Sequence, residues 1–182
     1  VFMLMFVIVG ISTIWMHVAI GRNIEVVIVD VDILDALPTK QKINGAAEAI
    51  KTGFIADAEI IEAFEMDGID TDLENIVNRS VAVKTKVVND DFTERGTRAI
   101  LNYGHTIGHA IETTTGRPHG ESVSIGMVAA GHASRHQLGF SGAERQSDIL
   151  ERIGLPVSAP EAKLDGSPRG LRVACAHTPR RR

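Results

Sequence analysis

The spacing of apolar residues along the chain predicts a mainly helical protein. Within residues 39–54, apolar side chains recur every three or four positions, at Ile43, Ala47, Ile50 and Phe54. This repeat places them on one face of a helix, where they can be buried. A helix is therefore predicted from residue 39 onward, and a short acidic helix over residues 57–65 follows it.

A second amphipathic helix is predicted over residues 71–88. Thr71 followed by Glu74 has the spacing of a capping box at the first turn. Lys84 lies on the otherwise apolar stripe of this helix. Its long side chain either extends along the surface to water or points into a polar site. The same reasoning predicts helices over residues 121–138 and 143–153, with a break at Gly116, Arg117 and Pro118 between the central stretch and the first of them.

The two ends of the chain have a different character. Residues 1–21 are almost wholly apolar, which is long enough for a membrane span, but we expect them to be the edge of another domain. The β-branched residues 25–30 predict a short strand. Residues 161–182 carry six basic and two acidic residues without periodicity and are predicted to be a disordered tail. The expected helical domain is thus residues 22–160.

Composition adds few constraints. Only 4% of the 182 residues are aromatic, so the core must be aliphatic. The net charge of −4 gives no basic field over the helical domain and argues against a nucleic-acid partner. The single cysteine, Cys175, excludes an intrachain disulfide and favours a reducing, cytoplasmic location.

Candidate chemistry is concentrated between residues 98 and 121. Arg98, Asn102, His105 and His109 recur at helical spacing, and Gly104 and Gly108 would allow a backbone or ligand to come close. From spacing alone, His105 and His109 are the first metal pair to propose, with the carboxylate of Glu112 one turn further on. The alternative is an ordinary pair of helix histidines. His132 and His136 have the same spacing without a nearby acid, and we assign them no role.

Three blocks of sequence carry a resemblance to a known family. They are G-A-A-E-A-I-K-T-G-F-I-A-D at 45–57, K-T-K-V-V-N-D-D-F-T-E-R-G-T-R at 84–98, and L-N-Y-G-H-T-I-G-H-A-I-E at 101–112 with H-G-E-S-V-S-I-G-M at 119–127. In this order they resemble dehydroquinate synthase and its sugar-phosphate cyclase relatives. The resemblance implies the helical, metal-binding C-terminal domain of that family, with a short remnant strand near the N-terminus.

The resemblance also implies a set of site residues. One divalent metal, Zn²⁺ or Co²⁺, would be held by Glu48, His105 and His119. This set replaces His109, which spacing favoured, by His119 from the following segment. The residues implied to contact the substrate are Lys51, Lys84, Arg98, Asn102 and His109. Without the resemblance, Glu48 and Lys51 would be interpreted as a solvated helix salt bridge. Asp91 and Glu94 are weaker candidates for orienting the cations.

The activity implied by the resemblance is the conversion of 3-deoxy-arabino-heptulosonate 7-phosphate to 3-dehydroquinate and phosphate, a step of the shikimate pathway. NAD⁺ would be bound by a nucleotide-binding domain that this sequence does not contain, so we expect the chain alone not to complete the reaction. The alternatives are another cyclase, such as 2-deoxy-scyllo-inosose synthase, and a non-catalytic metal-binding helical remnant. The expected partner is a small sugar phosphate, and a homodimer is possible.

Overall fold

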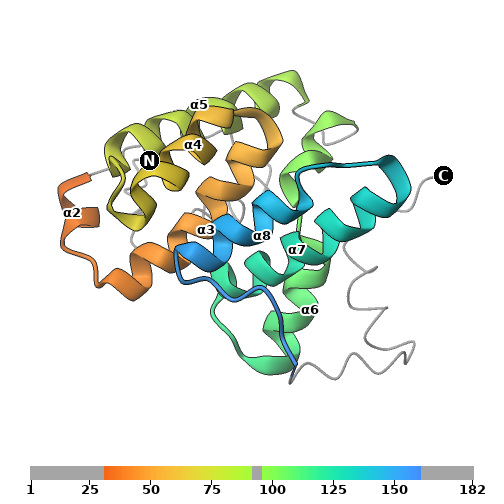
Figure 1. The fold of residues 1–182 in the computed structure, drawn as a ribbon. Helices are drawn as coiled ribbons and strands as arrows, with labels where there is room; N and C mark the ends of the chain where they lie inside the picture. Colours follow the sequence, from red (N-terminus) through yellow and green to blue (C-terminus); the bar gives the residue numbers. More distant parts are fainter. Residues whose placement is uncertain (1–30, 92–95, 161–182) are drawn as a thin grey trace, which may run out of the picture.

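The computed structural model describes residues 31–91 and 96–160, and the regular secondary structure within them is all helical. The mainly α prediction is therefore confirmed. The apolar residues 1–21, the strand predicted at 25–30 and the tail at 161–182 lie outside the described residues. In chain order the helices are α2 (Val31–Asp35), α3 (Thr39–Ala56), α4 (Ala58–Asp67), η1 (Gly68–Asp70), α5 (Leu73–Asp90), η2 (Thr97–Asn102), α6 (His105–Thr115), α7 (His119–Leu138) and α8 (Ala143–Arg152) (Figure 1).

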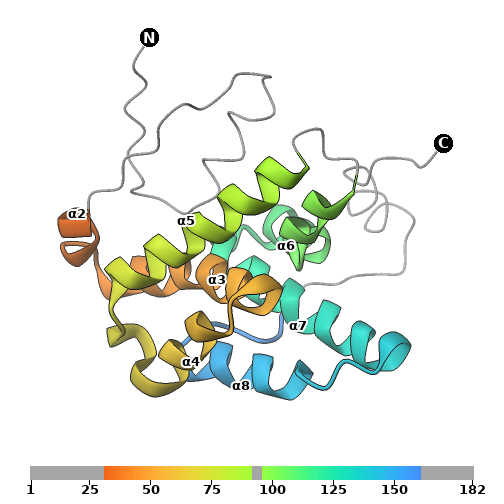
Figure 2. The same cartoon turned by 90° about the horizontal axis from the view of Figure 1, so that it is seen from above.

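Helix α3 runs through the middle of the fold and contacts α4, α5, α7 and α8. Helix α5 lies along one side of α3, with α4 and α8 on the other (Figure 2). Helices α6 and α7 form the most extensive helix pair. The core between these elements is mostly aliphatic, as the low aromatic content predicts, and its fully buried side chains include Ile50, Ile60, Phe64, Val123, Met127 and Leu150.

Glycines allow the backbones of α3, α6 and α7 to approach closely. A Cβ atom added to Gly126 of α7 would lie 2.0 Å from the carbonyl oxygen of Gly104, just before α6. A Cβ atom on Gly120 would lie 1.9 Å from the carbonyl oxygen of Asn44 in α3. No side chain fits at either position, because the start of α6 lies directly against α7 and the start of α7 lies directly against α3.

Two local predictions were wrong. The residues from Arg98 to His109 do not form one helix, because the left-handed Gly104, with φ of 76°, separates η2 from α6. Helix α5 is capped by Asp72 and not by Thr71: the Asp72 Oδ1 atom accepts a hydrogen bond from the backbone N–H of Asn75 at 3.1 Å. Within the described residues, none of the helices is both long enough and apolar enough to cross a bilayer.

Candidate metal centre

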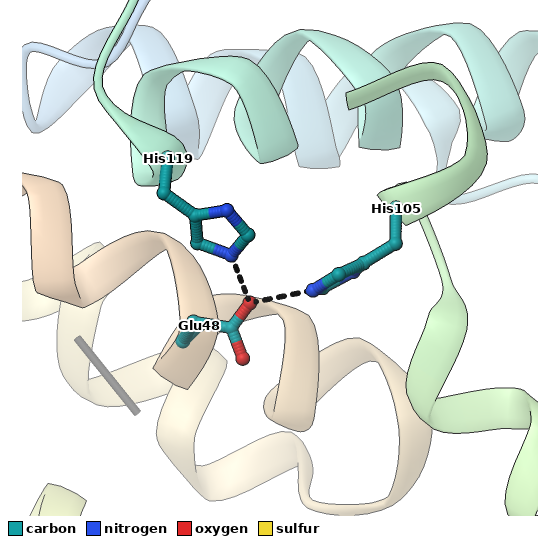
Figure 3. A group of neighbouring side chains, drawn as sticks. All are labelled: Glu48, His105 and His119. Carbon is teal, nitrogen blue, oxygen red and sulfur yellow. Dashed lines mark ion pairs between the residues drawn. The ribbon is translucent and has the colours of Figure 1, made fainter. Parts of the chain in front are cut away.

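The site is organised around Glu48, a carboxylate in the middle of α3 that is 1% exposed. Its Oε1 atom lies 3.2 Å from Nε2 of His105 and 3.7 Å from Nε2 of His119. Figure 3 shows both rings directed at the same carboxylate oxygen. Glu48, His105 and His119 come from α3, α6 and α7, so the site exists only when these three helices are packed together.

The other oxygen of Glu48 faces two lysines. Its Oε2 atom lies 2.9 Å from Nζ of Lys51 and 3.5 Å from Nζ of Lys84. Lys51 is fully buried, and Lys84 lies against the carboxylate instead of extending to water. A buried charge is costly unless it is paired, so the lysines and the carboxylate each lower the burial cost of the others.

This packing shifts the pKa values of the buried groups. Burial alone would raise the pKa of Glu48, but Lys51, the two histidines and Lys84 together hold it well below its usual range. Burial lowers the pKa of Lys84 to about 8, with Glu48 opposing the change and Lys51 adding to it. The carboxylate is therefore ionised across the neutral range and available as a ligand.

Hydrogen bonds on the far side of each ring fix how the histidines present their nitrogens. The Nδ1 atom of His105 lies 3.2 Å from the carbonyl oxygen of Tyr103, and Nδ1 of His119 lies 3.0 Å from Oε2 of Glu112. Both partners are acceptors, so Nδ1 carries the proton and donates in each case. Nε2 is then the nitrogen that faces Glu48 in both rings. Contact with Glu48 raises the pKa of His119 despite its burial, and Glu112 adds to the rise.

The arrangement fits a divalent metal. Ligand atoms of Glu48, His105 and His119 all lie within 4.8 Å of one another. The Glu48 Oε1 and His119 Nε2 atoms are buried, and neither has a hydrogen-bond partner within the described part of the chain. Two imidazole nitrogens and one carboxylate oxygen are a donor set of catalytic zinc sites, which keep a further position open.

His109, which spacing alone favoured, lies beside this group and contacts a different carboxylate. Its ring centroid is 5.3 Å from that of His105 and 5.6 Å from that of His119. Its Nδ1 atom lies 3.3 Å from Oε2 of Glu112. Burial lowers the pKa of His109, with Glu112 opposing the change. The two rings that face Glu48 are therefore those of His105 and His119.

Arg98 and Asn102 lie on η2, which packs against α5 and α3. Arg98 is buried at the start of η2, and Asn102 is half-buried at its end. Asp91, expected to orient cations, also holds the backbone: its Oδ2 atom accepts from the N–H of Gly96 at 2.7 Å and of Arg98 at 3.1 Å. The contacts of these residues with a substrate stay predictions, and Glu94 lies outside the described residues.

Sequence reasoning missed two supporting groups. The carbonyl of Tyr103 gave no signal, because every residue has one. Glu112 was noticed only as a possible metal ligand, whereas its Oε2 atom accepts from two histidines. The i, i+3 spacing of His109 and Glu112 was the available signal.

Comparison with known proteins identifies the family. Residues 45–169 match the family described as 3-dehydroquinate synthase C-terminal. The chain belongs to this family. Among curated 3-dehydroquinate synthases, that of Pseudarthrobacter chlorophenolicus is 44% identical over 156 residues, covering 80% of this chain and 43% of the relative. That of Thermodesulfovibrio yellowstonii is 46% identical over 144 residues, covering 72% and 40%.

The chain spans less than half the length of these relatives. Among solved structures, ValA (2-epi-5-epi-valiolone synthase) from Streptomyces hygroscopicus subsp. jinggangensis 5008, with NAD⁺ and Zn²⁺ bound, superimposes with a TM-score of 0.68 at 24% identity. The match covers 81% of this chain and 43% of that one. At this identity the likeness establishes the shared fold.

Proposed function

We propose that this chain supplies the metal- and substrate-binding half of a 3-dehydroquinate synthase, which converts 3-deoxy-arabino-heptulosonate 7-phosphate to 3-dehydroquinate and phosphate. One observation carries the proposal. In a chain that belongs to the 3-dehydroquinate synthase C-terminal family, the buried carboxylate of Glu48 lies between two histidines and two lysines.

In this proposal Glu48, His105 and His119 hold one divalent ion, Zn²⁺ or Co²⁺. Such an ion supplies Lewis acidity toward a substrate oxygen. The described residues form helices and not the strand–turn–helix unit that cradles a dinucleotide, so we place NAD⁺ binding outside them. NAD⁺ supplies the transient oxidation that the reaction requires.

The remaining site residues bind and orient the substrate. A sugar phosphate that also carries a carboxylate needs cationic partners, which Lys51, Lys84 and Arg98 provide. Asn102 adds a neutral hydrogen-bonding group. The His109 side chain is 46% exposed, against 11% for His105 and 19% for His119. His109 therefore lies at the solvent side of the histidine cluster, where a ligand reaches it first.

A chimeric enzyme tests this proposal. The 156 residues of the Pseudarthrobacter chlorophenolicus enzyme that align with this chain are replaced by the corresponding residues from it. With NAD⁺ and Zn²⁺, the chimera is expected to release phosphate from 3-deoxy-arabino-heptulosonate 7-phosphate, and Glu48→Gln is expected to abolish that release. His132→Ala, which alters an exposed histidine on α7, is the matched control and should leave turnover unchanged.

Two results would contradict the proposal. A folded, zinc-loaded chimera that turns over only a different sugar phosphate would make this chain part of another cyclase, such as 2-deoxy-scyllo-inosose synthase. A folded chimera that binds zinc but turns over no sugar phosphate would make it a non-catalytic metal-binding domain.

A further inference from the structure

Glu112 connects two histidines of the cluster through a single oxygen atom. Its Oε2 atom lies 3.0 Å from Nδ1 of His119 and 3.3 Å from Nδ1 of His109. Glu112 lies on α6, and His119 is the first residue of α7. One carboxylate therefore joins the end of one helix to the beginning of the next.

This contact decides which nitrogen each ring exposes. A carboxylate accepts hydrogen bonds, so each Nδ1 atom must carry a proton, and in the neutral ring Nε2 is then the nitrogen whose lone pair is available to a metal ion. In His119, that nitrogen lies 3.7 Å from Oε1 of Glu48. His119 needs such a constraint, because it opens α7 directly after Pro118, where no side chain caps the helix.

The same carboxylate also depends on the two rings. Its Oε2 atom has the Nδ1 atoms of both rings as its hydrogen-bond donors. An ionised acceptor forms stronger hydrogen bonds than a neutral one. The three side chains therefore stabilise one another in a single arrangement.

A second metal ion is the competing interpretation of this group. Ligand atoms of His109, Glu112 and His119 also lie within 4.8 Å of one another. Nδ1 of His119, however, cannot donate a hydrogen bond to Glu112 and bind an ion at the same time. Two ions on opposite sides of this ring would require a fully deprotonated imidazolate between two positive charges. The hydrogen-bonded arrangement needs neither.

We infer that Glu112 is a positioning residue that orients the metal ligand His119 and the substrate-side His109 together. The inference rests on the proposed metal site for its consequence, which is tighter metal binding. Its structural content, the proton on Nδ1 of both rings, does not require a metal. Carboxylates that support metal-bound histidines in this way commonly change metal affinity by about 10–100-fold when they are removed.

The first measurement is zinc affinity, by competition with a chromophoric chelator. Glu112→Ala is expected to weaken zinc binding by about 10–100-fold. Glu112→Gln keeps a carbonyl oxygen that can accept from both rings but removes the negative charge, so its zinc affinity should fall between those of Glu112→Ala and the unmodified chain. The matched control is Glu121→Ala, which removes the same charge from a carboxylate that instead pairs with Arg117 at 3.1 Å. It should bind zinc like the unmodified chain.

The second measurement is the protonation of the rings, by long-range ¹H–¹⁵N correlation of the metal-free chain. His109 and His119 should give the pattern of a proton on Nδ1 in the unmodified chain and in Glu121→Ala. Both should lose that preference in Glu112→Ala, which a merely structural role for Glu112 would not predict. If the chain binds no zinc, the proposed metal function fails, whereas the ring protonation still tests Glu112.

Unchanged ring protonation in Glu112→Ala would overturn the inference. Two zinc ions per chain would also overturn it, provided that both Glu112→Ala and His109→Ala lose one of them. That result would make the group a second metal site.

Discussion

The two carboxylate oxygens of Glu48 have different neighbours. One carboxylate oxygen faces the histidines, and the other faces the lysines. The two lysines differ in how they contact it: Lys51 is closer to Oε2 than Lys84 and is more completely buried. Their removal should therefore have different effects on stability.

Lys84→Met is expected to be neutral or stabilising. Burial lowers the pKa of Lys84 to about 8, which means that the folded protein disfavours its charge. Replacing it with an apolar side chain of similar length relieves that cost, and Lys51 at 2.9 Å still pairs with the Glu48 carboxylate. Lys51→Met removes the closest partner of a fully buried carboxylate and should destabilise the fold by about 3–5 kcal/mol. Denaturant unfolding of both variants without metal measures this difference, and equal losses would contradict it.

The choice between His109 and His119 is a second question at the residue scale. We expect His119→Ala to lose bound zinc because its Nε2 atom is directed at Glu48, and we expect His109→Ala to retain one zinc ion per chain. Metal analysis after dialysis measures both. If His109→Ala lost the metal and His119→Ala kept it, helix spacing would have identified the ligands better than the family resemblance.

The sequence alone could not have identified Glu48. Its spacing to Lys51 is that of many solvated helix pairs, and only burial distinguishes this pair from them. Lys84 gave a clearer signal, because a lysine on an apolar stripe contradicts the pattern around it. Comparison with a known family was needed to connect the two residues.

At the scale of elements, the hydrophobic pattern predicted the helices well and their ends less well. The periodicity of residues 39–54 and 71–88 corresponds to α3 and α5. Thr71 and Asp72 are both good capping residues, and the sequence does not show which side chain reaches the first turn. Arg98 and Asn102 fit a helical repeat with His105. The repeat gives no sign, however, that Gly104 turns the chain between Asn102 and His105.

Close packing of α6 against α7 should depend on glycine. Gly126→Ala is expected to destabilise the fold by about 1–3 kcal/mol, because the added carbon would lie 2.0 Å from the carbonyl oxygen of Gly104. Gly45→Ala is the matched control in α3. Nothing lies within 4 Å of its added carbon, so it should stabilise the fold by about 0.5–1 kcal/mol through helix propensity. Thermal unfolding of both variants distinguishes a local clash from a general effect of the substitution.

At the scale of the whole molecule, the site depends on helices that are far apart in the sequence. His105 and His119 come 57 and 71 residues after Glu48 along the chain. Periodicity describes each helix separately and contains no information on which of their faces meet. The packing of α3 against α7, and of α7 against α6, brings these three side chains together.

Metal binding should therefore stabilise the fold as a unit. An ion that bridges α3, α6 and α7 binds the folded chain and not the separated helices, so zinc at about 100 times its dissociation constant should add about 2.7 kcal/mol to the free energy of unfolding. The rise in melting temperature should reverse on chelation and be absent in His105→Ala. The double variant His132→Ala/His136→Ala, which removes an exposed histidine pair from α7, should keep the full zinc effect. If that double variant lost the effect and His105→Ala retained it, zinc would be binding at the surface of α7, and the stability of the three-helix packing would not depend on a metal at Glu48.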